Sequence, residues 1–296
     1  MSLDTEAGQQ ESVSAEPYVS LTYRYLRIGM VLTVVAIFVA VAIQFQQSNG
    51  TLLGSISAYY YTPAQFVFVA SLVAIGVSLI VIRGRDGWED GLLNLAGMFA
   101  IVVAIVPTPL VGDCLAPPVD AADALSAAVH NNLLTYLMVG STVLAGSTVG
   151  VLRARNARKR GVAVAPNRFV ALLPSVLIGL GGWYVFLFAW GFVNMCAHPV
   201  SAISLFGCIA AVVAINAIGA QSPSLRSIYW TVVAAMLVAG VVIVVGRGAW
   251  SEHWVLILEA AEIGLFAAFW IVQTLDPQHR RAPEFDRYRV PPMLKL

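Results

Sequence analysis

Charged residues are scarce in this chain of 296 residues. Asp, Glu, Lys and Arg make up 11% of it, whereas an average soluble domain has about 25%. The 17 basic and 16 acidic residues nearly balance, so the composition gives no sign of a nucleic-acid partner. Hydrophobic residues reach 59%, and the mean hydropathy is +0.80. These values predict a protein that lies mostly within a lipid bilayer.

Several motifs of well-known enzyme and transporter classes are also missing. The chain has no Gly-x-Ser-x-Gly nucleophile elbow and no Walker-type phosphate loop. It also lacks an inverted repeat and a pair of broken helices. These absences disfavour an ATP-driven pump and a standard secondary transporter.

Eight apolar stretches are long enough to cross the hydrocarbon core, which takes roughly 20 residues of helix. Lipid cannot satisfy backbone hydrogen-bonding groups, so each stretch is predicted to be helical. The predicted fold class is therefore all-α, a bundle of eight transmembrane helices over residues 24–275. A disordered cytoplasmic tail is predicted at 1–23 and a second cytoplasmic tail at 276–296. The spans are 27–45, 63–82, 91–110, 131–152, 169–193, 200–220, 227–246 and 254–275.

The basic residues give the bundle an orientation. With eight helices, almost every Lys and Arg falls on the side that holds both tails, and only Arg247 falls on the other side. Because cytoplasmic loops of membrane proteins are enriched in Lys and Arg, both termini are predicted to be cytoplasmic. The expected location is the bacterial inner membrane.

Most side chains with catalytic potential fall on the predicted outer side. Ser57 lies beside three consecutive tyrosines and is a candidate nucleophile, although Tyr residues of this kind also form interfacial belts. Asp113 is a further catalytic candidate. The outer helix ends carry three histidines that could bind zinc or could simply lie at the interface, namely His130, His198 and His253.

Glu259 and Glu262 lie within the last predicted span, about one and two turns from its outer end. They are three residues apart and so are neighbours on the helix surface. Ionisable residues at membrane depth usually face the bundle interior or a cavity and often have a function. The alternative is that both carboxyl groups are hydrogen-bonded to polar residues of neighbouring helices.

Two of the three cysteines are predicted on the outer side. Cys114 and Cys196 lie in loops that flank the predicted hairpin of the spans 131–152 and 169–193. Because the compartment outside a bacterial inner membrane can oxidise thiols, they are predicted to form a disulfide. The alternative is two separate thiols on the same side.

Two resemblances follow from these motifs. The stretch Ser55-Ile-Ser-Ala-Tyr-Tyr-Tyr-Thr62, with Glu89-Asp90 and Pro107-Thr108, resembles a group of uncharacterised bacterial multi-pass membrane proteins. This resemblance implies that the hairpin 131–152 and 169–193 is an addition to a common core. A more distant similarity is to the CREST superfamily of membrane hydrolases, which use Ser, Asp and three His around zinc. The matching residue types are Ser57, Asp113, His130, His198 and His253, without the Ser-x-x-x-His and His-x-x-x-His spacings of that superfamily.

Three functions remain open at this point. The first is a membrane protein that binds membrane lipid or a small apolar ligand in an outward-facing polar pocket lined by the last helix. The second is a zinc-dependent lipid hydrolase that acts in the outer leaflet. The third is a proton-coupled transporter that uses Glu259 and Glu262. A bound zinc ion would distinguish the first from the second.

Overall fold

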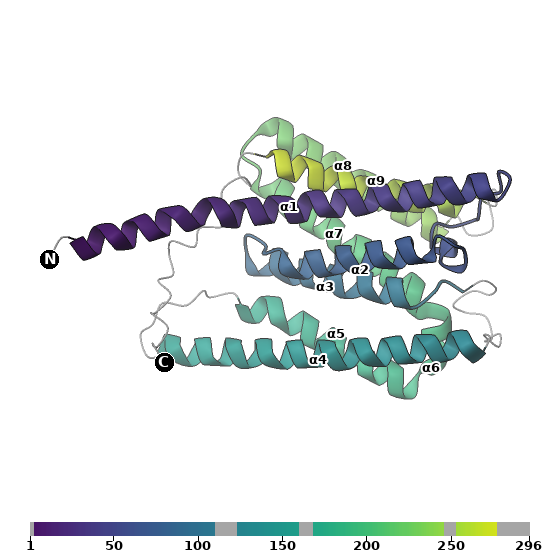
Figure 1. The fold of residues 1–296 in the computed structure, drawn as a ribbon, viewed down its shortest axis with the longest axis horizontal. Helices are drawn as coiled ribbons and strands as arrows, with labels where there is room; N and C mark the ends of the chain where they lie inside the picture. Colours follow the sequence, from purple (N-terminus) through teal and green to yellow (C-terminus); the bar gives the residue numbers. More distant parts are fainter. Residues whose placement is uncertain (1–2, 110–122, 160–167, 246–252, 277–296) are drawn as a thin grey trace.

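The structure is a computed structural model that describes residues 3–109, 123–159, 168–245 and 253–276. Every regular element in these ranges is a helix (Figure 1). The long helices are α1 (Leu3–Gln47), α2 (Gln65–Val81), α3 (Gly87–Ile105), α4 (Asp123–Lys159), α5 (Arg168–Phe188), α7 (His198–Gly219), α8 (Pro223–Val245) and α9 (Trp254–Leu275). The short ones are the 3-10 helix η1 (Ser57–Tyr61), α6 (Trp190–Phe192) and the π-helical turn η2 (Val193–Ala197).

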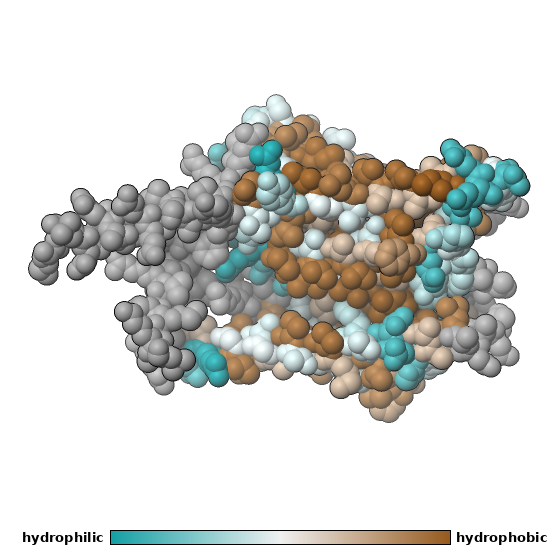
Figure 2. Space-filling view, viewed as in Figure 1, coloured by the Kyte–Doolittle hydropathy of each residue, from teal (hydrophilic) through white to brown (hydrophobic). Residues whose placement is uncertain are grey.

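Each predicted span coincides with one of the eight long helices, so the prediction of an all-α membrane bundle is confirmed. Among the described residues, six helices are long and apolar enough to cross a membrane, and two shorter apolar helices, Gln65–Val81 and Leu172–Phe188, accompany them. Figure 2 shows a hydrophobic band across the middle of the molecule with hydrophilic residues toward both ends. This is the surface expected of a protein whose flanks contact lipid.

The two ends of the bundle differ in composition. The basic end carries Arg83 and Arg85 between α2 and α3, and Arg226 in the first turn of α8. The tyrosine end carries the loop of residues 48–64, here called the tyrosine loop, which contains η1. Tyr61 in this loop donates a hydrogen bond to the carbonyl of Thr108 just after α3, at 2.7 Å. The two ends correspond to the two sides predicted from the Lys and Arg distribution.

The tails differ from their predicted boundaries. α1 begins at Leu3, so the stretch predicted as a disordered tail continues the helix. Glu, Gln and Ala are good helix formers, and a helix extends readily once the spanning segment has formed it. Asp276 was assigned to the C-terminal tail, but it caps α9 and is buried. Its carboxylate accepts a hydrogen bond from Tyr229 at 3.2 Å, which explains its burial. Residues 277–296 lie outside the described part.

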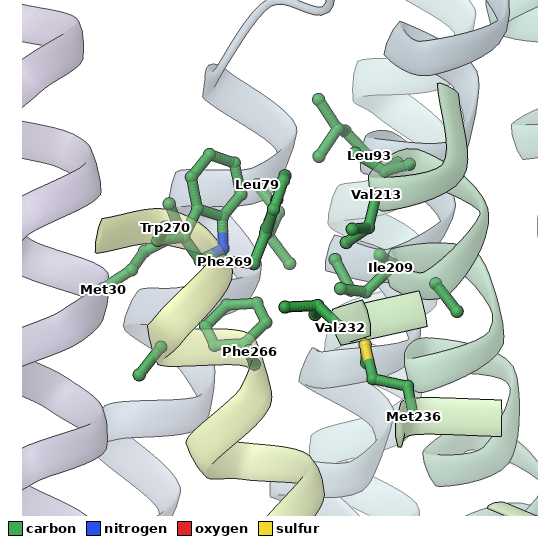
Figure 3. Packing of buried hydrophobic residues seen from close by; sticks show 14 of the residues in the cluster. Met30, Leu79, Leu93, Ile209, Val213, Val232, Met236, Phe266, Phe269 and Trp270 are labelled. Atoms are coloured by element: carbon green, nitrogen blue, oxygen red, sulfur yellow. The ribbon is translucent and has the colours of Figure 1, made fainter. Parts of the chain in front are cut away.

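Six helices share the main hydrophobic core: α1, α2, α3, α7, α8 and α9. Figure 3 shows side chains from several of them meeting around the aromatic residues of α9. Phe269 and Trp270 are fully buried there, and their ring centroids lie 4.9 Å apart. Burying such rings is a large apolar contribution to packing. The labelled residues are Met30, Leu79, Leu93, Ile209, Val213, Val232, Met236, Phe266, Phe269 and Trp270.

α2 and α3 approach each other most closely at two glycines. A Cβ atom added to Gly76 would lie 2.8 Å from the carbonyl oxygen of Gly97, and one added to Gly97 would lie 2.5 Å from the carbonyl oxygen of Gly76. Small residues allow this backbone approach, which is a common way for membrane helices to associate. The contact fixes α3, whose C-terminal end contributes to the site described below.

α4 and α5 lie together at one side of the bundle (Figure 1). They pack on α3 through a smaller hydrophobic cluster that includes Val106, Leu137 and Phe186. Only 6% of the most apolar window of α4 is buried. The hairpin is therefore peripheral, and the site lies in the six-helix core.

Candidate functional site

Glu259 of α9 fixes the tyrosine loop in place. Its Oε2 atom accepts hydrogen bonds from the Ser55 hydroxyl at 2.7 Å, the Ile56 amide at 2.6 Å and the Ser57 amide at 3.3 Å. Its Oε1 atom accepts one from the Ser57 hydroxyl at 3.2 Å. Ile56 is the N-cap of η1 and Ser57 is its first residue, so these two amides have no partner within that helix and a carboxylate is a natural acceptor for them. Glu259 thus has four donors, all from one loop.

A backbone contact strengthens this attachment. The amide of Leu256 in the first turn of α9 donates to the carbonyl of Gly54 at 2.9 Å. A ring nitrogen of His253 donates to the carbonyl of Leu52 at 3.3 Å. The loop and the start of α9 therefore form one connected unit at the tyrosine end.

Glu262 has very different surroundings, although it is only three residues further along α9. It is 2% exposed, and its Oε2 atom has no hydrogen-bond partner. Three residues of α-helix turn the side-chain direction by about 60° from that of Glu259, because a turn takes 3.6 residues. Glu259 therefore meets the loop, while Glu262 lies on the side of α9 that faces α8. The pair predicted from the sequence divides into a satisfied and an unsatisfied carboxyl group.

His198 is another buried polar side chain with an atom that has no hydrogen-bond partner. It is the first residue of α7, directly after the π-helical turn η2. Its Nδ1 atom donates to the carbonyl of Val106, the C-cap residue of α3, at 2.6 Å. This bond fixes the neutral tautomer in which Nε2 is an acceptor. His198 is 3% exposed, and Nε2 has no partner.

A cavity of about 590 Å³ brings these groups together. This volume is in the range of sites for small molecules. The tyrosine loop, α2, α3, α7, α8 and α9 all contribute to its wall. Most of the wall is apolar, with residues such as Phe68, Leu72, Phe206 and Met236. The polar side chains in the wall are Ser55, Ser57, Thr108, His198, Glu259 and Glu262.

Ser57 lines the cavity, but its hydroxyl donates to Glu259 rather than to a histidine. The imidazole of His198 is held by α3 instead. The structure therefore places the predicted nucleophile beside the cavity without the serine–histidine hydrogen bond that activates a nucleophile.

The three histidines predicted as zinc ligands do not come together. His130 stacks on the side of the α4–α5 hairpin, with its ring centroid 4.8 Å from that of Phe186 and 5.2 Å from that of Trp190. His253 contacts the tyrosine loop, and only His198 reaches the cavity. Among the described residues, no group of three His, Cys, Asp or Glu side chains could hold a metal ion. The three residues belong to different elements of the bundle: His130 to α4, His198 to α7, and His253 to the N-cap position of α9.

Two further predictions involve residues that the structure does not describe. Asp113 and Cys114 both lie within residues 110–122. Cys196 is buried in the π-helical turn before His198. The disulfide between Cys114 and Cys196 therefore stays a prediction.

A polar cluster at the basic end was not predicted as a unit. Glu89 is 2% exposed; its Oε1 accepts from the Asn216 amide at 2.7 Å, and its Oε2 accepts from the Arg85 backbone amide at 2.7 Å. The Arg85 guanidinium donates to Asn216 Oδ1 at 3.1 Å, and Gln273 donates to the same oxygen at 3.3 Å. The isolated Asn and Gln residues in apolar spans could have indicated this cluster, because such residues often form hydrogen bonds between helices.

No protein-family model, curated protein or solved structure matches this chain.

Proposed function

We propose that this protein binds a lipid or another small apolar ligand in the cavity between α7, α8 and α9. One observation carries the proposal: a largely apolar cavity contains two buried polar atoms, His198 Nε2 and Glu262 Oε2, that have no hydrogen-bond partner among the described residues. Buried polar groups are nearly always hydrogen-bonded, so unused ones in a cavity favour a ligand. Ionisable residues at membrane depth support the same interpretation.

The opening of the cavity supports a ligand that comes from the membrane. Ile203 of α7 and Leu237 and Val241 of α8 are among its lining residues and are 49%, 55% and 60% exposed. They lie within helices that are apolar enough to span a bilayer. A ligand could therefore enter sideways from the hydrocarbon region.

A pair of glycine variants tests the proposal. A Cβ at Gly240 would have only Glu262 Oε1 within 4 Å, at 3.9 Å, so Gly240→Leu should extend into the cavity. Gly146 of α4 is exposed and has nothing within 4 Å of an added Cβ, which makes Gly146→Leu the matched control. We expect lipid-extract mass spectrometry to find a retained apolar molecule in wild type and Gly146→Leu and to lose it in Gly240→Leu. Equal retention in all three would contradict the proposal.

The orientation belongs to the same proposal. The Lys and Arg distribution favours a cytoplasmic basic end in a bacterial inner membrane, so the cavity would lie in the outer half of the bilayer. A reporter that is active only in the cytoplasm should work when it is inserted near Arg158 and fail near Asp120. The reverse pattern would contradict this orientation.

Proton-coupled transport is a second candidate, and one observation favours it. α7 and α9 both carry buried polar residues near each of their ends: His198 and Asn216 in α7, and Glu262 and Gln273 in α9. Such residues often mark a path across a membrane. Proteoliposomes that contain a pH-sensitive dye would test it, because Glu262→Gln should abolish a proton flux that wild type supports. An absence of flux in wild type would exclude this candidate.

A further inference from the structure

The polar wall of the cavity restricts the chemistry of the ligand, and this inference rests on the proposed function. The described lining includes two carboxyl groups, Glu259 and Glu262, and no Lys or Arg. A lipid phosphate or carboxylate would lie near these groups without a cation to pair with. Buried charges need a partner, so an anionic head group is disfavoured.

The two cavity atoms without a partner, His198 Nε2 and Glu262 Oε2, call for a ligand that donates a hydrogen bond. In the neutral imidazole, His198 Nε2 is an acceptor because Nδ1 carries the proton and donates a hydrogen bond to the Val106 carbonyl. Glu262 Oε2 also lacks a partner. Glu259 cannot take this role, because four donors of the tyrosine loop already occupy its oxygens. The ligand would therefore meet His198 and Glu262 with an O–H group.

The rest of the cavity accommodates an apolar chain. Phe68 and Leu72 of α2 and Phe206 of α7 line it. The lining residues Ile203, Leu237 and Val241 are exposed on the lipid-facing side. A chain longer than the cavity could leave it between α7 and α8 and continue into the bilayer, while its polar end stays inside.

We propose that the cavity binds an uncharged lipid alcohol. Its hydroxyl group donates to His198 Nε2 or Glu262 Oε2, and its hydrocarbon chain lies along α2 and α7. This class is defined by one neutral O–H donor on a long apolar chain. Lipids that carry a phosphate or carboxylate are disfavoured, because the described lining has two carboxyl groups and no Lys or Arg.

Three chain-matched probes test this assignment: oleyl alcohol, oleyl methyl ether and oleic acid. The protein should be held in nanodiscs of dioleoylphosphatidylcholine, a lipid without O–H or N–H donors, and binding followed by competition against radiolabelled oleyl alcohol. We expect the ether to bind roughly tenfold more weakly, since it loses a hydrogen bond and leaves an acceptor unpaired. The acid should bind more weakly than the alcohol. An ether or acid that competes as well as the alcohol would overturn the assignment.

Two variants separate this inference from the function on which it rests. Gly240→Leu should abolish binding of all probes, whereas Glu262→Leu should reduce the preference for the alcohol over the ether. If Gly240→Leu abolishes binding but wild type does not discriminate alcohol from ether, the cavity binds lipid and only the assigned class is wrong. If no probe binds to wild type, the proposed function fails as well.

Discussion

The polar clusters at the two ends of the bundle use similar residues in opposite ways. At the basic end, Glu89 accepts from Arg85 and Asn216, and Gln273 donates to Asn216, so side chains of several helices bond to one another. The Oε1 atom of Gln273 has no hydrogen-bond partner among the described residues, but Gln273 does not line the cavity. At the tyrosine end, Glu262 and His198 each keep an unused atom that faces a cavity. A network of hydrogen bonds between helices holds them together, whereas unused acceptors beside a cavity favour a ligand.

The same contrast occurs within α9 over a single turn. Glu259 has four donors and fastens a loop, while Glu262 has an oxygen without a partner. Burial of a carboxyl group therefore does not reveal its role. The number of donors around it separates a structural carboxylate from one that is available to a ligand.

The largest expected effect comes from the basic end. Glu89→Leu would remove an acceptor of the Asn216 side-chain amide and of the Arg85 backbone amide, and the Glu89–Arg85 ion pair at 3.6 Å would be lost. We expect a destabilisation of about 2–3 kcal/mol, less than for a fully buried pair because Arg85 is partly exposed. Unfolding by sodium dodecyl sulfate in mixed micelles would measure it. A change no larger than that of Glu262→Leu would remove the distinction between the two ends.

A smaller effect is expected when the loop attachment is weakened. Glu259→Gln replaces an acceptor oxygen with an NH₂ group that cannot accept from Ser55 and the Ile56 and Ser57 amides. The loss should be about 1–2 kcal/mol, the scale of one or two ordinary hydrogen bonds. Hydrogen exchange should accelerate in residues 54–62. Glu262→Gln is the control with the same chemistry on the same helix, and equal acceleration there would contradict the assigned role of Glu259.

The smallest effect on stability is expected at the proposed ligand site. Glu262→Leu removes a buried oxygen that has no partner, so the free energy of unfolding without ligand should stay the same or rise by about 1 kcal/mol. The same variant should show a reduced preference for an alcohol ligand. A destabilisation of several kcal/mol in the absence of ligand would mean that Glu262 has a structural partner, and the comparison between the two ends would fail.

The helices were predictable because each span has a continuous apolar run and the Lys and Arg residues fall on one side. The depth of Glu259 and Glu262 was also evident from their place in the last span. The separate roles of Glu259 and Glu262 could not be predicted, because they depend on which side of α9 the tyrosine loop packs against. Position around the bundle is set by packing, so the sequence could place His130, His198 and His253 at one end but not on one wall.

His198 illustrates the same limit in local structure. The residues before it were predicted as a loop between the spans 169–193 and 200–220, but they form a π-helical turn that joins α6 to α7. Such turns are rare and often occur at functional sites. No spacing rule in the sequence indicated that Nδ1 of His198 would donate to a carbonyl at the C-terminal end of α3. The helix ends there because Pro107 cannot continue it.

The hydrogen bonds of Glu259 also set an order of assembly. Ser55 and Glu259 are 204 positions apart, so a ribosome that makes a few residues per second completes the loop many seconds before its anchor exists. During that interval the amides of Ile56 and Ser57 must donate their hydrogen bonds to water at the membrane surface instead. The arrival of α9 captures the loop and encloses the cavity wall in one event, so a nascent chain that stops before α9 would carry no ligand site.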